Sequence, residues 1–301
     1  MANKILCIGE ALVDIYQVND SYKVNPGGAP FNVACSLGRL ESEVYFYGAI
    51  GDDDYGKIIL DNLELHKVEN DFVQILNSQK TTQALVSLDK NGERNFEFIS
   101  GADQYLEPTN FDEKFSKVNL VHFGSATGLM EGELFKAYQN LLKWSLEKNL
   151  KISFDPNFRD KLWNGKETEF ETKALNFFKV ADFVKFSEEE LDMLFEGDDL
   201  NAKLINANKL NPKALICVTL GEKGTKYIYK NQLKNIESTS VKAVDTTGAG
   251  DAFAAMMLNQ LNKSQNWEKL DFNEIVRVAN QFACQAVKHQ GALTFLNHLG
   301  E

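Results

Sequence analysis

The segment best suited to chemistry lies near the end of the sequence, where residues 245–253 read DTTGAGDAF. An apolar, helix-forming stretch follows, so we expect the glycines to lie at the N-terminus of a helix. Backbone N–H groups there have no partners within the helix, and glycines let a phosphate approach them. Asp251 falls in the first turn, where its carboxylate would repel a passively bound phosphate but could accept a hydroxyl proton during phosphoryl transfer. The spacing alone leaves open a plain tight turn with Asp251 as a helix cap.

Two better-known phosphate-binding loops do not fit this segment. A Walker loop needs Gly-x-x-x-x-Gly-Lys-Ser/Thr, and the sequence contains no such string. A dinucleotide-binding fingerprint needs a third glycine where Phe253 stands, and it normally falls early in a strand–helix–strand unit. A dinucleotide-dependent oxidoreductase is therefore a remote alternative, which a titration with NADH would exclude.

Short apolar runs alternate with amphipathic stretches along most of the chain. This pattern predicts an α/β fold with a mostly parallel central sheet flanked by helices on both faces. The expected strands are Lys4–Gly9, Val44–Ala49, Leu120–Phe123, Ile152–Phe154, Phe183–Phe186 and Leu215–Thr219. The expected helices are Gly56–Leu65, Glu133–Lys148 and Glu188–Phe195.

Two segments in the first third interrupt this rhythm. Residues 13–24 contain alternating apolar side chains and indicate an exposed β excursion. Residues 81–101 contain two alternating runs around an Asp-Lys-Asn-Gly turn, which is a hairpin signal. We expect the two segments to pair into a small antiparallel sheet beside the main one. Because there is no internal repeat and no low-complexity linker, residues 1–301 are expected to form a single domain.

Composition narrows the classes of partner. The 301 residues include 32 Lys and Arg against 43 Asp and Glu, a net charge of −11, which argues against a broad nucleic-acid or anionic-membrane surface. No segment approaches the roughly 20 apolar residues of a membrane span, and Glu10 comes too early for a signal peptide. Cys7, Cys35, Cys217 and Cys284 lie far apart in apolar contexts, which predicts buried reduced thiols in a cytoplasmic protein.

Further motifs occur along nearly the whole chain. They are GEALVD at 9–14, GGAPFNVA at 27–34, GAIGDD at 48–53, DPNFR at 155–159, SEEE at 187–190 and VTLGEKG at 218–224. With residues 245–253, these motifs make the sequence resemble the ribokinase-like carbohydrate kinase family, and within it the bacterial fructokinases. The resemblance implies a ribokinase-like fold in which the two β excursions form a lid over the sugar.

The resemblance also implies roles for residues at the sugar and the transferring phosphate. Asp251 matches the catalytic base, and Gly248, Ala249 and Gly250 match the anion hole. Asp14, Gly28 and Asn32 match sugar-binding positions. Two further residues are expected at the substrates: Phe96, on an aromatic face of the lid that could cover the sugar ring, and Arg159, which follows the strand ending at Asp155 and is a candidate clamp for the phosphate. From the residues alone, Asn32 could be a helix N-cap, Asp14 a turn residue and Arg159 a surface ion-pair partner.

Other matched positions concern the nucleotide and its cations. The nucleotide-binding positions are Asn157, Lys185, Ser187, Thr219, Gly221, Gly224 and Asn280. Glu190 matches a residue that orders Mg²⁺ through water. Asp245, Thr247 and Gly291 match a monovalent-cation site that holds K⁺ in many relatives.

The expected function is therefore ATP-dependent transfer of a phosphoryl group to a primary hydroxyl of D-fructose. Where relatives often have Arg and Pro in the lid, this chain has 99–101 reading ISG, so a ribokinase or a 2-keto-3-deoxygluconate kinase is the alternative. A sugar or nucleotide sensor without catalysis is a second alternative, against which the intact Asp251 argues. The lid edges offer a surface through which two copies could pair as a homodimer.

Overall fold

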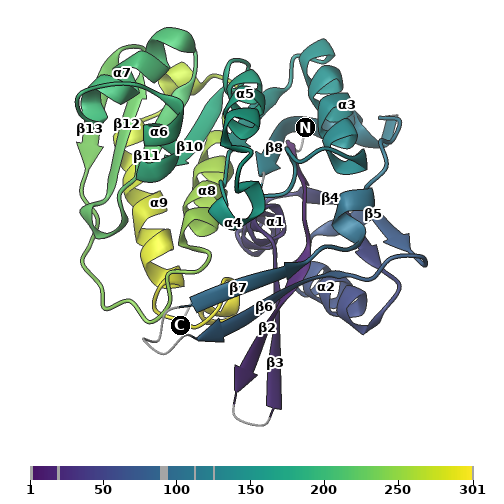
Figure 1. The fold of residues 1–301 in the computed structure, drawn as a ribbon. Coiled ribbons are helices and arrows are strands. Elements are labelled where there is room, and N and C mark those ends of the chain that lie inside the picture. The colour runs from purple at the N-terminus through teal and green to yellow at the C-terminus, as the bar shows by residue number, and fades with distance from the viewer. Residues whose placement is uncertain (1–2, 19–20, 89–93, 112, 125, 300–301) are drawn as a thin grey trace.

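The computed structural model describes residues 3–18, 21–88, 94–111, 113–124 and 126–299; the side chains of 18, 87–88, 94–96 and 113–114 are outside that description. Within these residues, one large sheet is covered by helices on both faces, and a small sheet projects from it (Figure 1). None of the helices in these ranges has both the length and the apolar character that crossing a membrane requires.

The large sheet has the strand order β13-β12-β11-β10-β9-β8-β1-β4-β5. Its strands are β1 Lys4–Ile8, β4 Val44–Gly51, β5 Glu69–Leu76, β8 Val118–Gly124, β9 Lys151–Asp155, β10 Phe183–Ser187, β11 Leu215–Thr219, β12 Thr225–Tyr229 and β13 Gln232–Ile236. All neighbouring pairs from β5 to β11 are parallel, whereas β12 and β13 pair antiparallel at one edge. The carboxyl ends of the parallel strands therefore meet at one edge of the sheet, where open α/β sheets bind ligands.

Alternate side chains of each strand enter cores on opposite faces of the sheet. In β1, for example, Ile5 and Cys7 face one core, and Leu6 and Ile8 face the other. Helices α1 Ala29–Arg39, α2 Asp54–Leu65, α8 Ala249–Leu261 and α9 Phe272–Ala286 cover the first face. Helices α3 Glu133–Glu147, α5 Glu167–Phe178, α6 Glu188–Leu194 and α7 Leu200–Leu210 cover the second. A short helix, α4, spans Asp160–Trp163.

The small sheet, which we call the lid, has the order β3-β2-β6-β7. Its strands are β2 Leu12–Val18, β3 Ser21–Gly27, β6 Thr82–Leu88 and β7 Arg94–Ile99. The outer pairs are antiparallel and the central pair, β2 and β6, is parallel. The lid hangs below the carboxyl edge of the large sheet (Figure 1).

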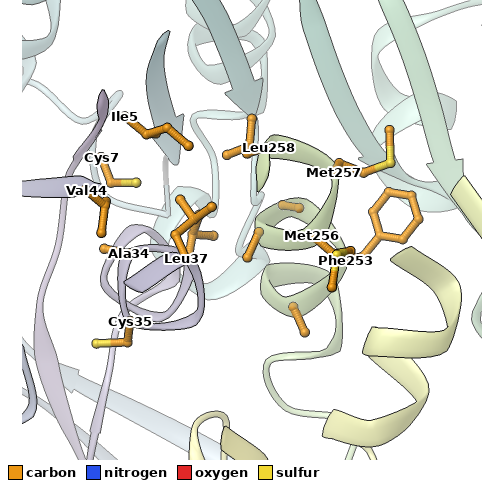
Figure 2. Close-up of a cluster of buried hydrophobic side chains, with 14 of the residues drawn as sticks. Ile5, Cys7, Ala34, Cys35, Leu37, Val44, Phe253, Met256, Met257 and Leu258 are labelled. Carbon is orange, nitrogen blue, oxygen red and sulfur yellow. The ribbon is translucent and has the colours of Figure 1, made fainter. Parts of the chain in front are cut away.

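Helices α1 and α8 pack side by side against the sheet through a buried apolar cluster. Figure 2 shows Leu37 of α1 facing α8, with Leu258 of α8 and Ile5 of β1 near it, whereas Ala34 of α1 and Phe253 of α8 lie farther apart in the same cluster. These side chains are at most 1% exposed. Because packing fixes the two helices against each other, it also brings their N-termini together, and those termini carry the GGAPFN and GAGD motifs.

The six strands and three helices expected from the sequence are all present, with ends within two residues of those predicted. The expectation of an exposed β excursion at residues 13–24 was wrong for β2, because Val13, Ile15 and Tyr16 are at most 8% exposed, but it was right for the outer part of β3, where Tyr22 is 71% exposed. The inner face of the lid belongs to the same core as α1 and α8. The turn expected at 89–92 lies outside the described residues.

Candidate functional site

The N-terminus of α8 is shaped by glycine. Gly248 is the N-cap, with a left-handed φ of 79°, and a Cβ built on it would lie 2.7 Å from Ala292. A Cβ on Gly250 would lie 3.0 Å from the Nζ atom of Lys185. The first turn of α8 therefore presents bare backbone N–H groups beside a buried ammonium group, an arrangement that suits an anion.

Asp251 faces α1 rather than capping its own helix. Its Oδ2 atom accepts a hydrogen bond from Nδ2 of Asn32, with a distance of 2.8 Å. Burial raises the pKa of Asp251 to about 6; the charge of Asp155 adds to the rise, and the Asn32 hydrogen bond and the charges of Lys185 and Arg159 oppose it. Asp251 is thus poised to gain or lose a proton near neutral pH. The alternatives of Asp251 as a helix cap and Asn32 as an N-cap are both wrong, because Gly248 and Gly28 occupy the cap positions.

Lys185 forms a buried ion pair across two neighbouring strands. Its Nζ atom lies 2.9 Å from Oδ2 and 3.2 Å from Oδ1 of Asp155, at the carboxyl end of β9. Burial lowers the pKa of Lys185, but the charges of Asp155, Glu190 and Asp251 outweigh it, and the net shift is upward. Lys185 therefore stays protonated, and one ammonium group faces three carboxyl groups. A triphosphate entering this cluster would need to bring a cation with it.

Glu190 fixes the loop that follows β9. Its two carboxylate oxygens accept the backbone N–H groups of Phe158, at 2.8 Å, and of Ser187, at 2.7 Å. Ser187 caps α6 in return by accepting the N–H of Glu190 at 3.1 Å. Asn157 in this loop is 6% exposed and has a φ of 46°, a left-handed conformation that Asn tolerates better than most residues. The loop is thus held rigidly next to Lys185.

The lid and the N-terminus of α1 form the side of the site opposite Lys185. Asp14 lies in β2, not in a turn, and a Cβ built on Gly27 would lie 2.9 Å from its Oδ2 atom. Gly28 has a φ of 108°, and a Cβ there would lie 2.4 Å from the backbone oxygen of Glu10, so only glycine fits. Oδ1 of Asn32 and Nδ2 of Asn25 are buried atoms without hydrogen-bond partners among the described residues. An unpaired acceptor and an unpaired donor suit a ligand rich in hydroxyl groups.

The positive charge of Arg159 acts on two carboxyl groups of the site. Burial raises the pKa values of both Asp251 and Glu10, and the positive charge of Arg159 opposes that rise at each of them. Arg159 is exposed, donates to the backbone oxygen of Phe158 at 3.1 Å and forms no ion pair among the described residues, so the alternative of a surface ion pair is wrong.

A cavity of about 350 Å³ adjoins the N-terminus of α8 on its other side. Its walls come from the β11–β12 turn, from residues 238–246, from the first turns of α8 and from α9. The predicted nucleotide residues that line it are Thr219, Gly221, Gly224 and Asn280. Asn280 bonds to Thr225 and Ile236, so its amide also holds the β12–β13 hairpin in place. The cavity meets Lys185 at Gly250, which joins a nucleotide-sized space to the anion site.

Asp245 ties together the two loops beside the anion site. Its carboxylate accepts the N–H of Thr247 through Oδ1 and that of Gly291 through Oδ2, both at 2.9 Å. Asp245 is 4% exposed. Among the residues that the structure describes, no group of three His, Cys, Asp or Glu side chains could hold a metal ion.

The structure therefore gathers the predicted site residues along one edge of the large sheet. Phe96 is the exception that cannot be placed, because it lies in β7 but its side chain is outside the described residues. Sequence reasoning did not assign roles to Asp155, Asn25 or Glu10. Asp155 and Glu10 each stand at or just after the carboxyl end of a parallel strand, and that position was the signal that could have found them.

The fold, together with the groups at the carboxyl edge of the large sheet, is that of a class of small-molecule kinases. These have an α/β core, an anion-binding helix N-terminus and a carboxylate beside that N-terminus. The chain matches the model of the pfkB family of carbohydrate kinases over residues 2–298, and it belongs to that family.

Individual proteins that are similar to this chain are also sugar kinases. A fructokinase of Vibrio alginolyticus is 31% identical over 98% of this chain and 96% of its own. The crystal structure of a fructokinase with bound ATP from Xylella fastidiosa superimposes with a TM-score of 0.87, at 28% identity over 98% of this chain and 95% of that one. A fructokinase double mutant from Vibrio cholerae O395 with fructose, ADP and potassium ion bound gives 0.86, at the same identity and coverage.

Proposed function

We propose that this protein phosphorylates a primary hydroxyl of D-fructose with ATP and releases fructose 6-phosphate and ADP. The observation that carries the proposal is the position of Asp251. It sits between Asn32 on the sugar side and Gly250 and Lys185 on the phosphate side, within reach of both reactants. The relatives described above, with ATP in one structure and fructose and ADP in another, support these substrates.

In this proposal Asp251 accepts the proton of the attacking hydroxyl. The sugar oxygen bonds to the γ-phosphorus while the bond from that phosphorus to the β–γ bridging oxygen breaks. The hydroxyl proton passes to Asp251, and ADP leaves with the bridging oxygen. Because the pKa of Asp251 is raised to about 6, the carboxylate is a stronger base than an ordinary Asp and is still mostly ionised at neutral pH. The backbone N–H groups of Gly248 and Gly250 and the ammonium group of Lys185 stabilise the charge on the transferring group. The N–H of Ala249, the third expected member of the anion hole, donates to the backbone oxygen of Thr246 at 3.2 Å and would have to turn from it to reach the phosphate.

The charge of the site fits a nucleotide that arrives with Mg²⁺. Lys185 faces Asp155, Glu190 and Asp251, so the cluster is acidic without further cations. Mg²⁺ prefers phosphate oxygens and waters to an all-protein cage, which agrees with the lack of a three-carboxylate cluster among the described residues. Bound there, it would neutralise β- and γ-phosphate charge, with Glu190 holding one of its waters. The buried carboxylate of Asp245, between two loops, suits a K⁺ site.

Residues 1–301 would act as one unit in which the lid closes over the sugar. Closure excludes water, which otherwise competes with the sugar for the phosphoryl group. The exposed Tyr22 on β3 and Ile99 on β7 lie on the outer strands of the lid, and we propose that a second copy pairs there. All four cysteines are free thiols; Cys7, Cys35 and Cys217 are buried as expected, whereas Cys284 is half-buried. Free thiols fit a reducing compartment such as the cytoplasm.

The substrate is tested with a panel of sugars in an assay for ADP. We expect kcat/KM for fructose to exceed that for ribose and for 2-keto-3-deoxygluconate. A preference for ribose would replace the substrate but keep the mechanism.

The mechanism is tested by Asp251→Asn. We expect kcat to fall by about 10²–10⁴-fold, because the base is lost. Titration calorimetry should show an ATP affinity within about tenfold of the original, or about 1.4 kcal/mol. Asp192→Asn, at an exposed ion pair with Lys203, is the matched control. Unchanged turnover in Asp251→Asn would remove the proposed mechanism.

A further inference from the structure

Glu10 lies just after β1, against the wall of the proposed sugar site, and has no role in the mechanism above. It is 1% exposed. Its carboxyl group is near the N–H of Ala29, the first residue of α1, and its backbone oxygen lies where a Cβ on Gly28 would be. Glu10 therefore contacts the helix terminus that carries Gly28 and Asn32.

The hydroxyl of Thr127 joins Glu10 to a second buried carboxyl group, Asp103. Oγ1 of Thr127 lies 3.0 Å from Oδ2 of Asp103 and 3.4 Å from Oε2 of Glu10. Asp103 also accepts the hydroxyl of Thr82 and, at 2.8 Å, Nε2 of Gln104. Asp103 thus has three donors, whereas Oε1 of Glu10 has no partner among the described residues.

Counting protons assigns the direction of these bonds. A threonine hydroxyl has one proton, so Thr127 cannot donate to both carboxyl groups. Asp103 is the nearer acceptor. Glu10 can then bond to Thr127 only by donating a proton of its own to the hydroxyl oxygen. Two carboxyl groups that share one buried site favour a state in which one is neutral.

We propose that Glu10 is a positioning residue for sugar binding that acts as a neutral acid, closing a chain of hydrogen bonds from Glu10 through Thr127 to Asp103. Thr82 is the first residue of β6, and Asp103 follows β7. The chain of hydrogen bonds therefore connects the lid strands β6 and β7 to β1 and α1, which Figure 1 shows next to them. When Glu10 gives up its proton to solvent, two negative charges face one hydroxyl and the sugar side loosens. The phosphate side around Lys185 is untouched. This inference rests on the proposed function, because it concerns the same sugar site.

The charged and titratable groups around Glu10, Thr127 and Asp103 set the pH at which Glu10 loses its proton. Burial raises the pKa of Glu10 to about 7; the charge of Asp103 adds to this, and Arg159 and nearby N–H groups oppose it. Burial also raises the pKa of Asp103; its three donors oppose the rise, but the net shift is upward. Tyr138 of α3 and Cys7 of β1 face the same space, and burial raises the pKa of each well above neutral, so both stay uncharged. Glu10 is therefore the group that titrates here near neutral pH.

The test compares the pH dependence of KM for fructose with that of kcat in the wild type and in Glu10→Gln. In the wild type we expect KM to rise up to about tenfold for each pH unit above the pKa of Glu10, with little change in kcat. Glutamine donates a hydrogen bond at every pH, so Glu10→Gln should lose this rise. Both proteins should keep the fall in kcat/KM at acidic pH that Asp251 causes. Glu133→Gln, on the exposed face of α3, is the matched control and should keep the wild-type profile.

The variants Thr127→Val and Thr127→Ser distinguish the effect of the Thr127 hydrogen bonds on sugar binding from the effect of packing at this position. Valine removes the bridging hydroxyl and should raise KM for fructose by about tenfold, near 1.4 kcal/mol, across the pH range. Serine restores the hydroxyl and should restore KM. A KM rise at alkaline pH that persists in Glu10→Gln, or a KM in Thr127→Val equal to the wild-type value, would overturn the inference.

Infrared difference spectroscopy provides a readout that does not depend on turnover. Because Asp251 also carries a proton in part near pH 6, both proteins are compared in the Asp251→Asn background. There the C=O band of a protonated carboxyl group should disappear as pH rises through about 7 with Glu10 present and be missing after Glu10→Gln. An Asp251→Asn protein without that band at pH 6 would also overturn the inference. If no sugar is phosphorylated but the band titrates as expected, the proposed function is wrong, whereas the inference that Glu10 is a neutral acid in this chain of hydrogen bonds is supported.

Discussion

Two buried clusters of ionisable side chains flank the proposed site of phosphoryl transfer, and they are built in opposite ways. In the cluster around Lys185, an ammonium group pairs with Asp155, and Glu190 accepts two backbone N–H groups. In the cluster around Glu10, two carboxyl groups share one hydroxyl and no ammonium group is bonded to them among the described residues. In the first cluster a protonated amine offsets the carboxyl groups, whereas in the second, by our inference, one of the two carboxyl groups is neutral.

The difference matches what each side must bind. Phosphates need fixed positive charge and N–H donors, which a buried cation and a helix N-terminus supply without reorganisation. A sugar needs acceptors and donors in balance, and a net charge there would add a desolvation cost without a partner in the ligand. The predictions below act on one cluster at a time.

The largest effect is expected from Lys185→Met. Removing the cation leaves Asp155 buried and unpaired, which should cost about 3–5 kcal/mol in the free energy of unfolding. It also removes a donor to the transferring phosphate, so kcat should fall by about 10²–10³-fold. Urea titration and steady-state kinetics measure the two effects. Lys203→Met, at an exposed ion pair with Asp192, should cost no more than about 1 kcal/mol.

Adding Asp155→Leu to Lys185→Met separates folding from chemistry. The double variant buries no unpaired charge, so most of the lost stability should return. Its kcat should stay low, because the ammonium group is still missing. If kcat returned together with stability, Lys185 would matter for the fold alone.

A smaller effect is expected from Gly248→Ala. The left-handed φ of 79° and the 2.7 Å approach of a Cβ to Ala292 should together cost about 2–3 kcal/mol and displace the first turn of α8. We expect kcat/KM to fall by at least about tenfold, or 1.4 kcal/mol. Gly221→Ala is the comparison, because φ there is 58° and no atom lies within 4 Å of the added Cβ. It should cost about 1 kcal/mol, and equal losses in the two variants would show that close packing at Gly248 is unimportant.

The strands of the large sheet and the glycine-rich turns at the site could be predicted from the sequence, because each depends on residues that are close together in the chain. Buried parallel strands appear as short apolar runs, and the motifs at 27–34 and 245–253 require glycine through local geometry. The packing of α1 against α8, which brings Asn32 to Asp251, followed only from the family resemblance. Contacts between residues so distant in sequence depend on the shapes of both helices, and no local pattern encodes them.

Other features escaped sequence reasoning for physical reasons. The β12–β13 hairpin turns at Lys230 and Asn231, which have φ values of 48° and 64° without any glycine to signal them. Strand β5 is an edge strand with several polar, exposed side chains, so it lacks the apolar run of a buried strand. The Glu10 chain joins four segments of the sequence, and each of its residues alone is unremarkable in its local context.

The smallest effect of a single substitution is expected on the pH dependence of stability, which tests whether the carboxyl groups on the sugar side hold protons. Burial, the largest cause in both, raises the pKa of Asp251 from 3.8 to about 6 and that of Glu10 from 4.5 to about 7. Between those limits the folded protein binds more protons than the unfolded chain. The free energy of unfolding should therefore fall as pH rises from about 5 to 8, by roughly 4 kcal/mol in total.

Urea titrations at pH 5 and pH 8 measure this fall. Asp251→Asn and Glu10→Gln each remove one raised pKa, so each should shrink the difference between the two pH values by about 1–2 kcal/mol, and the double variant should nearly abolish their share. Glu133→Gln, at an exposed ion pair with Lys136, should leave the difference as it is. A wild type that became more stable towards pH 8 would mean that these carboxyl groups are ionised at little cost, and the contrast between the two clusters would be lost.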